Sequence, residues 1–202
     1  MSPRPTTGHV RRPAILKAAA EVIAERGVIG TRIADVAERA GTSAPGVLYW
    51  FATKDELLTE ALSFSDDRFY AELSGQLADL DGARARLARL VELWPSEGDQ
   101  ETVLWMELWV RALRDPAVNA TRAALDARWR AAIADVVRDG QETGEFGEGD
   151  PEAFALTLGA VMDGFAIQLA LRDPAVTPAS VREHCMALVE ERLGLEGVAD
   201  GA

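Results

Sequence analysis

The sequence predicts an all-α protein with an N-terminal helix-turn-helix domain. Apolar residues recur at three- and four-residue steps along most of its 202 residues, and no alternating strand pattern persists. Between Thr31 and Leu58 two short helical segments flank Gly41, which is typical of a helix-turn-helix. A capping residue followed by proline then begins later segments, as at Asp115, Asp150 and Thr177. These observations predict a small three-helix domain followed by a larger helical domain.

The first predicted helix begins near Pro13, because proline suits the first turn of a helix. Its apolar stripe consists of Ile15, Ala18, Ala19, Val22 and Ile23. Gly27 is expected to end this helix, and the residues before Pro13 are expected to form a mobile arm.

The next two helices are short. Thr31 is expected to cap the first of them, and its inner face consists of Ile33, Val36, Ala37 and Ala40. Gly41 provides the turn, because glycine adopts positive φ at little cost. Thr42 or Ser43 can cap the following helix, in which Val47 and Phe51 are expected to face inward.

A fourth helix is expected to begin at Thr53-Lys54-Asp55-Glu56, which matches a capping box, and to run toward Leu80. Periodicity and caps predict further helices at about 83–94, 100–114, 116–142, 151–172 and 178–193. Residues 144–149, which are rich in glycine, are expected to form a loop. We therefore predict a DNA-binding domain with its arm over residues 1–54 and a second helical domain over residues 55–202.

The charge of the chain is unevenly distributed. The net charge is −12, yet residues 1–54 contain eight Lys/Arg and four Asp/Glu, which is +4 beside −16 for the rest. A basic N-terminal domain on an acidic body favours local contact with nucleic acid. A single cysteine excludes an intrachain disulfide, and no apolar run of about 20 residues or signal peptide is apparent. We therefore expect a cytoplasmic protein.

The second helix of the helix-turn-helix is expected to enter the major groove of DNA. Its outward residues Ala44, Pro45 and Gly46 are small, so the backbone can approach base edges, while Tyr49 and Trp50 can contact phosphates, sugars or thymine methyls. Arg32 and Lys54 begin helices, where free backbone N–H groups and the positive end of the helix dipole suit a phosphate. The predicted DNA-binding residues are Thr31, Arg32, Ser43, Ala44, Pro45, Gly46, Tyr49, Trp50 and Lys54. The alternative is that Tyr49 and Trp50 are core aromatics and Lys54 is a solvated capping residue.

The same stretch resembles the TetR family of bacterial transcriptional regulators. The matching residues are Thr31, Ile33, Ala34, Val36, Ala37, Ala40, Gly41, Ser43, Val47, Tyr49, Phe51, Lys54, Glu56 and Leu57. Counted without gaps from Gly41, Leu48 stands where the family usually has a tyrosine that contacts phosphate, and Tyr49 follows it. The resemblance leaves open which of the two makes that contact.

The resemblance implies that the C-terminal helices hold a small-molecule cavity and that the last two pair with those of a second copy. The segment 151–172 is apolar on more than one face, with small residues at Gly159, Ala160 and Gly164, as such pairing requires. The expected ligand-binding residues are Trp105, Met106, Trp109, Met162, Asp163 and Phe165, and Glu107 is a further polar candidate. Tryptophan and methionine at helical spacing are, however, more often part of a plain core than of a ligand cavity.

Catalysis has no support in the sequence. His184 and Cys185 are adjacent, so on a helix they point about 100° apart, and no metal-binding or phosphate-binding glycine motif is present. We therefore expect that the protein is not an enzyme and uses no cofactor or metal. We expect a homodimeric repressor that binds a palindromic operator and leaves this operator when a small molecule binds. The alternative is a dimeric helical binding protein whose helix-turn-helix contacts a partner protein.

Overall fold

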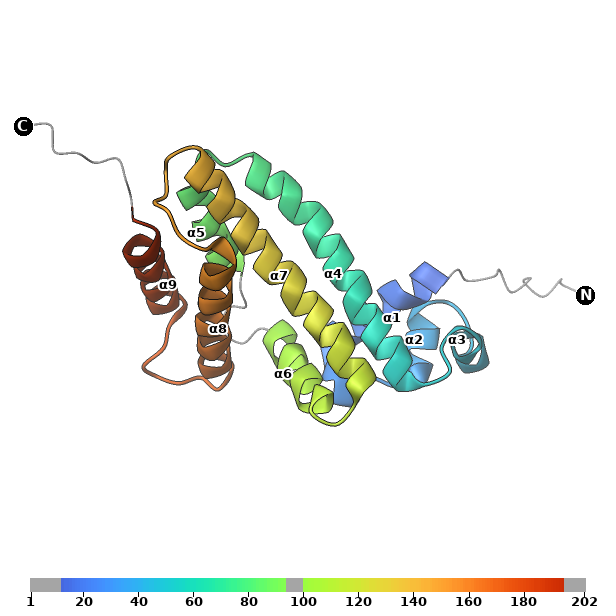
Figure 1. The fold of residues 1–202 in the computed structure, drawn as a ribbon. Helices are drawn as coiled ribbons and strands as arrows, with labels where there is room; N and C mark the ends of the chain where they lie inside the picture. Colours follow the sequence, from blue (N-terminus) through green and yellow to red (C-terminus); the bar gives the residue numbers. More distant parts are fainter. Residues whose placement is uncertain (1–11, 94–99, 195–202) are drawn as a thin grey trace, which may run out of the picture. The chain divides into compact units, whose positions relative to one another are not determined.

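The computed structural model describes residues 12–93 and 100–194, and every regular element in these ranges is an α-helix (Figure 1). The helices are α1 (Arg12–Gly30), α2 (Ile33–Arg39), α3 (Ala44–Trp50), α4 (Lys54–Ala78), α5 (Ala83–Leu93), α6 (Gln100–Ala112), α7 (Pro116–Glu142), α8 (Pro151–Ala170) and α9 (Pro178–Leu193). The all-α prediction is confirmed for this part of the chain. The predicted N-terminal arm lies outside the described residues.

The chain forms two compact units. Unit 1 consists of residues 1–71 and 103–121, and unit 2 consists of residues 72–102 and 122–202. Unit 1 therefore contains α1 to α3, most of α4, most of α6 and the first turns of α7. The boundaries of these compact units differ from the domain boundary that the sequence predicts between residues 54 and 55. That domain boundary therefore stays a prediction about which part of the chain binds DNA.

The core of unit 1 lies among α1, α2, α3 and the first turns of α4, which lie together in Figure 1. The inner faces predicted from periodicity are confirmed: Val36, Ala37, Val47 and Phe51 are all buried. The remaining buried members of this cluster are Ile15, Leu16, Ala18, Ala19, Val22, Ile23, Val28, Leu57, Leu58 and Ala61. This apolar core fixes α3 against α2, as a helix-turn-helix requires.

Helix α1 breaks at Gly27, where φ is 70° and ψ is 170°. The break was predicted, but the residues beyond it form a last turn that reaches Gly30. Thr31 closes this turn: its hydroxyl donates to the Gly27 carbonyl at 2.7 Å and its side chain is 1% exposed. The prediction that Thr31 caps the next helix was wrong, because Arg32 occupies the N-cap position of α2 without a side-chain bond.

The turn and caps of the helix-turn-helix follow the sequence closely. Gly41 has φ 68°, and Ser43 instead of Thr42 caps α3 by accepting from the Gly46 N–H at 3.2 Å. At the start of α4, Thr53 accepts from the Glu56 N–H at 3.0 Å. The Glu56 carboxylate accepts from Ala52 rather than Thr53, at 2.7 Å. The predicted capping box is thus formed with its second bond displaced by one residue.

The three proline-led helix starts are confirmed as capped. Asp115 accepts from the N–H groups of Ala117 and Val118, and Asp150 accepts from those of Glu152 and Ala153. Thr177 and Ser180 form a reciprocal capping box at α9. The expected helix ends fall within about two residues of the observed ones, because these signals are local.

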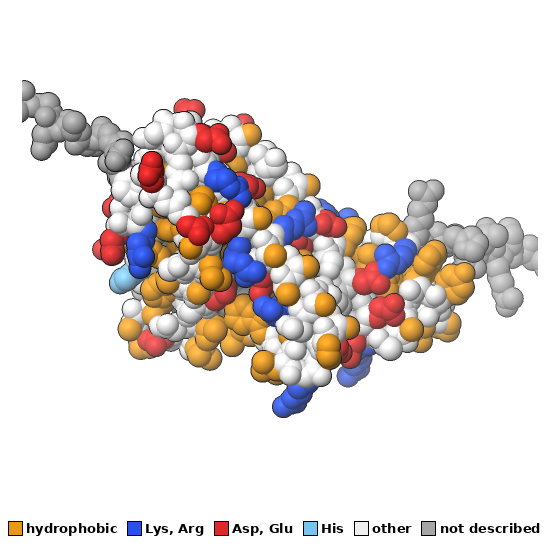
Figure 2. Space-filling view, viewed as in Figure 1, with side chains coloured by type: hydrophobic (Ala, Val, Ile, Leu, Met, Phe, Trp, Pro, Cys, Tyr) orange, Lys and Arg blue, Asp and Glu red, His pale blue; other side chains and the backbone are white. Residues whose placement is uncertain are grey.

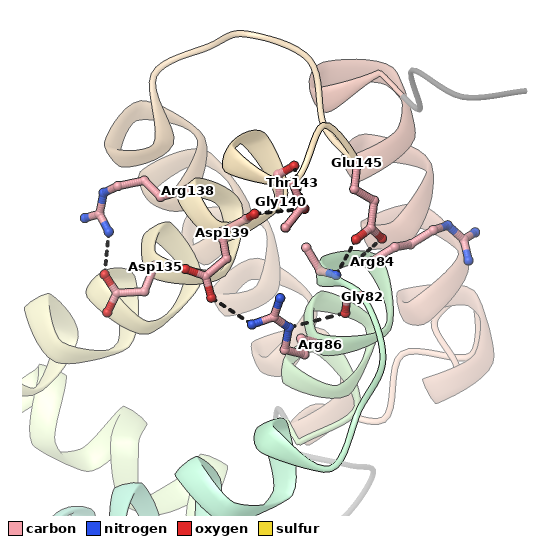
Figure 3. A network of polar contacts seen from close by, with 10 residues as sticks. Gly82, Arg84, Arg86, Asp135, Arg138, Asp139, Gly140, Thr143 and Glu145 are labelled. Atoms are coloured by element: carbon pink, nitrogen blue, oxygen red, sulfur yellow. Dashed lines mark hydrogen bonds and ion pairs between the residues drawn. The ribbon is translucent and has the colours of Figure 1, made fainter.

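In unit 2, α8 packs against α9 and α5 also contacts α9. The predicted loop after α7 is anchored to the start of α5 (Figure 3). Glu145 accepts from the backbone N–H groups of Ala83 at 2.5 Å and Arg84 at 2.7 Å, and so caps α5. Arg86 of α5 in turn pairs with Asp139 of α7 at 2.7 Å.

Helix α8 corrects one expectation. Its 20 residues are long and apolar enough to cross a membrane by length and composition, and it is the one such helix among the described residues. A core helix of a soluble protein passes the same test. Its buried face, which includes Leu158 and Met162, packs inside unit 2, and Asp163 lies midway along it.

Candidate nucleic-acid interface

Helix α3 is the candidate DNA-reading element, and three of its large side chains point to solvent. Tyr49 is 81% exposed, Leu48 is 47% exposed and Trp50 is 44% exposed, whereas Val47 and Phe51 on the opposite side are fully buried. The Tyr49 and Trp50 rings meet edge to face, with centroids 5.4 Å apart. The alternative that Tyr49 and Trp50 are core aromatics is therefore wrong.

The small residues at the front of α3 also lie at the surface. Pro45 is exposed, while Ala44 and Gly46 are half-buried. Ser43 is exposed, but its hydroxyl oxygen already accepts from Gly46. Thr31 is a correction: it is buried and its hydroxyl is used within α1, so its side chain is not available to DNA.

We call residues 12–61 the head. Most of its described basic side chains are held by acidic neighbours. Arg26 pairs with Asp35 at 2.9 Å, Arg39 pairs with Glu25 at 2.7 Å, and Arg12 pairs with Glu60. These ion pairs neutralise charges that the sequence alone counted toward a basic surface.

Arg32 and Lys54 differ from these residues. Within the described part of the head they are the basic side chains without an ion pair, and they lie at the starts of α2 and α4. Arg32 is exposed and Lys54 is half-buried. They flank α3 in the sequence, which makes them the best-placed candidates for phosphate contacts.

A cleft between α1 and α2 is lined by Val22, Arg26, Asp35, Glu38 and Arg39. Its arginines are paired with carboxylates, and the hydrogen bond from Arg39 lowers the pKa of Glu25. These ion pairs join α1 to α2 across the cleft, so the cleft residues have a structural role.

Helix α6 contacts the head through two polar side chains. The Glu107 carboxylate accepts from the Val28 N–H at 3.1 Å, directly after the break at Gly27, and Arg111 pairs with Asp55 near the start of α4. The Glu107 carboxylate satisfies a backbone donor that the broken helix leaves unpaired, and a ligand contact of Glu107 stays a prediction. The positive-φ glycine marked the break, but 79 residues separate the two partners.

The predicted ligand-binding residues divide between the units. Trp105, Met106 and Trp109 are half-buried on the part of α6 in unit 1. Met162, Asp163 and Phe165 lie on α8 in unit 2, where Met162 is fully buried and the Phe165 ring lies 5.7 Å from that of His184 on α9. Phe165 therefore contacts α9, whereas Asp163, two residues before it, lies on a different side of α8.

Asp163 is the strongest polar candidate in unit 2. It is half-buried and, among the described residues, forms no hydrogen bond or ion pair. Burial raises its pKa to about 6, and the nearby charge of Asp126 on α7 adds to this rise, while Arg130 and Arg122 oppose it. Burial also raises the pKa of Asp126, which pairs with Arg122. A cation placed beside Asp163 would relieve this cost of burial.

His184 and Cys185 do not form a catalytic pair. Cys185 is buried, and burial raises the pKa of its thiol to about 11, so the thiol stays protonated at neutral pH. His184 is exposed, with Nδ1 2.6 Å from the Ser180 carbonyl oxygen. This arrangement agrees with the divergence expected from their adjacent positions.

Comparisons with known proteins match both parts of the chain. Residues 15–61 match the family described as bacterial regulatory proteins, tetR family, and residues 83–194 match the one described as BetI-type transcriptional repressor, C-terminal. The transcriptional regulator BetI of Burkholderia mallei is 26% identical over 183 residues, covering 86% of this chain and 89% of that protein. The regulator PksA of Bacillus subtilis is 31% identical over 108 residues, which is 53% of this chain and 52% of that protein.

Two solved structures resemble the whole fold. A putative transcriptional regulator from Saccharomonospora viridis, in complex with choline, is 30% identical with a TM-score of 0.77, covering 90% of this chain and 96% of that one. A putative TetR-family regulator from Rhodococcus sp. is 32% identical with a TM-score of 0.75, covering 91% of this chain and 98% of that one.

Proposed function

Because the chain belongs to the TetR family of transcriptional regulators, with a BetI-type C-terminal domain, we propose that it is a cytoplasmic repressor that binds a palindromic operator as a homodimer. A small cationic molecule then binds unit 2 and releases the DNA. The family regulates transcription and is not enzymatic, which agrees with the lack of a catalytic motif in the sequence.

The single observation that carries this proposal is the exposed face of α3, which is fixed by a buried core. It is flanked in sequence by Arg32 and Lys54, which form no ion pair with another described residue. An apolar core behind and free side chains in front are what a helix needs to enter a major groove. Selection of bound duplexes from a random DNA pool tests it. Enrichment of a palindrome with two half-sites is expected, and no enrichment contradicts DNA binding.

The exposed face of α8 supports dimerisation. Leu156 is 58% exposed on this helix, Ala160 is exposed, and a Cβ added to Gly164 would meet no atom within 4 Å. Figure 2 shows hydrophobic side chains gathered over the lower part of α8. Small and apolar residues on the open face of a helix suit close pairing with a second copy, and two-fold pairing suits a palindromic operator.

We propose a quaternary ammonium ligand of the choline type for unit 2. The similar protein from Saccharomonospora viridis was solved with choline, and Asp163 offers a half-buried carboxylate without a partner among the described residues. Binding of a cation by Asp163 requires the carboxylate form. Because the pKa of Asp163 is about 6, neutral pH supplies that form and acid removes it.

Choline binding is therefore expected to weaken as pH falls below about 6, by up to about ten-fold per pH unit, since protonation of Asp163 competes with the cation. Asp163→Asn is expected to bind choline at least about ten-fold more weakly at neutral pH and without this pH dependence. Calorimetric titration at several pH values measures both. Asp81→Asn, which changes an exposed aspartate of the same unit, is the control. Equal pH profiles in all three proteins would exclude Asp163 as the cation site.

The raised pKa of Asp163 also affects stability. A carboxyl group whose pKa is higher in the folded chain stabilises the fold at low pH, and this contribution is lost as pH rises from about 4 through about 6. Asp163→Asn is accordingly expected to flatten the pH dependence of stability in this range. Denaturation measured in parallel with the calorimetry separates this effect from ligand binding.

The contacts of α6 with the head support coupling between ligand and DNA. Glu107 holds the break in α1 and Arg111 holds the start of α4, so a displacement of α6 would disturb both supports of the helix-turn-helix. Two states that differ in these bonds would provide the population shift that release of DNA requires.

Glu107→Ala combined with Arg111→Ala is expected to keep choline binding but to reduce the choline-induced decrease in duplex affinity several-fold, because the link between α6 and the head is removed. Anisotropy of a labelled duplex, with and without choline, measures this. Val110→Ala, an exposed change on the same helix, is the matched control and should leave the ligand effect intact. A full ligand effect in the double variant would contradict this route.

A second candidate function is recognition of a partner protein by α3. The observation that favours it is the apolar exposed surface of Leu48, Tyr49 and Trp50, since aromatic residues are enriched in protein interfaces. A partner-binding protein would show no duplex preference, whereas a DNA regulator binds its duplex with affinity that falls steeply as salt rises.

A further inference from the structure

We propose that α3 recognises thymine through its C5-methyl groups, so that each half-site presents thymines to Leu48, Tyr49 and the front of the helix. This inference rests on the proposed DNA-binding function and specifies the chemistry that the helix reads. It follows from the side chains that α3 presents, from those that it lacks, and from the few cations beside it.

The side chains of α3 exclude most forms of direct base recognition. Bidentate recognition of guanine uses Arg or Lys, adenine uses Asn or Gln, and cytosine is read by Asp or Glu. The seven residues of α3, Ala-Pro-Gly-Val-Leu-Tyr-Trp, include none of these. Ser43, directly before the helix, has its hydroxyl oxygen bonded to the Gly46 N–H.

What α3 does present is apolar surface. Leu48, Tyr49 and Trp50 are exposed, Pro45 is exposed beside them, and Ala44 is half-buried. Figure 2 shows hydrophobic side chains at the surface of the head where α3 lies in Figure 1. The thymine methyl is the apolar group that bases offer in the major groove, and apolar side chains contact it. Helix and base therefore match in chemistry.

The charges of the head support the same conclusion. Of the described cations of the head, Arg32 and Lys54 alone lack an ion pair, which leaves few side chains for phosphate contacts. Phosphate contacts orient a helix in the groove without reading sequence. Within the described part of the head, α3 and the recognition of DNA shape are therefore the sources of discrimination between sequences.

Replacement of single thymines by deoxyuridine in the selected duplex tests the proposal, because it removes the methyl group and keeps the base pair. At one or more thymines of each half-site, affinity is expected to fall about three- to five-fold per methyl removed. Leu48→Ala is expected to bind the thymine duplex more weakly and to abolish the deoxyuridine effect at one of these positions. Leu113→Ala, which also removes an exposed leucine side chain of unit 1, should behave as the parent.

The possible outcomes distinguish a failure of thymine recognition from a failure of the proposed DNA-binding function. A selected duplex that binds equally well with deoxyuridine at every thymine overturns thymine reading and leaves DNA binding intact. Half-sites without thymine at the invariant positions of the selected duplexes overturn it as well. If no duplex is selected from the random pool, the proposed DNA-binding function is itself contradicted. Because the deoxyuridine series uses the unaltered protein, it decides the question even if Leu48→Ala folds poorly.

Discussion

Gly140→Ala is expected to lower the free energy of unfolding by about 1–3 kcal/mol, although alanine favours helices. Gly140 lies near the end of α7, where the chain turns back and Phe146 covers it. A Cβ at this position would lie 2.7 Å from the Cβ of Ala83 and within 2.6 Å of the Phe146 ring. Ala83 and Phe146 are both buried, so neither can move aside without disturbing the packing of α5.

Gly75→Ala is the matched control for this change. Gly75 lies in α4, and an added Cβ would meet no atom within 4 Å, so alanine should stabilise the helix by about 0.5–1 kcal/mol. Chemical denaturation followed by circular dichroism compares both variants with the parent. Equal stability of Gly140→Ala and Gly75→Ala would show that the turn at Gly140 accommodates a Cβ after all.

The second large effect is expected on DNA binding. Arg32→Ala and Lys54→Ala are each expected to weaken binding to all duplex sequences and to reduce the slope of log affinity against log salt by about 0.9 for each phosphate that the protein no longer neutralises. Each change occurs in both subunits of the proposed dimer, so each variant removes a pair of cations from the complex. Combined, the two changes should remove most salt-dependent binding contributed by the described part of the head.

Lys17→Ala is the control for charge alone. Lys17 is an exposed residue of α1, 3.9 Å from Glu21, and its removal changes the net charge by the same amount. Titrations of one labelled duplex at several salt concentrations give the slopes. An unchanged slope in Arg32→Ala and Lys54→Ala would exclude both residues from phosphate contact.

Local features of the fold were predictable from the sequence. Ser43, Asp115, Asp150 and Thr177 cap the helices that follow them because each bond joins residues two or three positions apart. The inner face of the helix-turn-helix was predictable for the same reason, since periodicity identifies the side that must be buried. Thr31 is the exception: its hydroxyl bonds back to Gly27, an alternative that Thr offers equally well.

Long-range pairings were not predictable. Counting charges gave residues 1–54 a surplus of four positive charges, but Arg26 and Arg39 are paired with carboxylates in the folded head. Glu107 looked like a ligand contact because its neighbours in sequence are apolar, yet it bonds to Val28 on another helix. Such partners depend on tertiary packing, which a single sequence does not reveal.

The ligand-binding residues show the same limit. Met162, Asp163 and Phe165 are close in sequence and were all expected to bind the ligand. In the structure Phe165 contacts His184 of α9, whereas the charged side chains that act on Asp163 belong to α7. Asp163 is the member whose surroundings suit a cation, and Met162 is buried in the core of unit 2, which is the alternative that the sequence left open.

The central claim is that one chain joins a DNA-reading head to a sensor for a small cation and that the two are coupled. Affinity for the selected duplex, measured by anisotropy with and without saturating choline, tests it most directly. We expect choline to lower duplex affinity by about ten-fold or more, within the range of ordinary allosteric coupling. Unchanged duplex affinity while calorimetry shows choline bound to the same protein would contradict the claim.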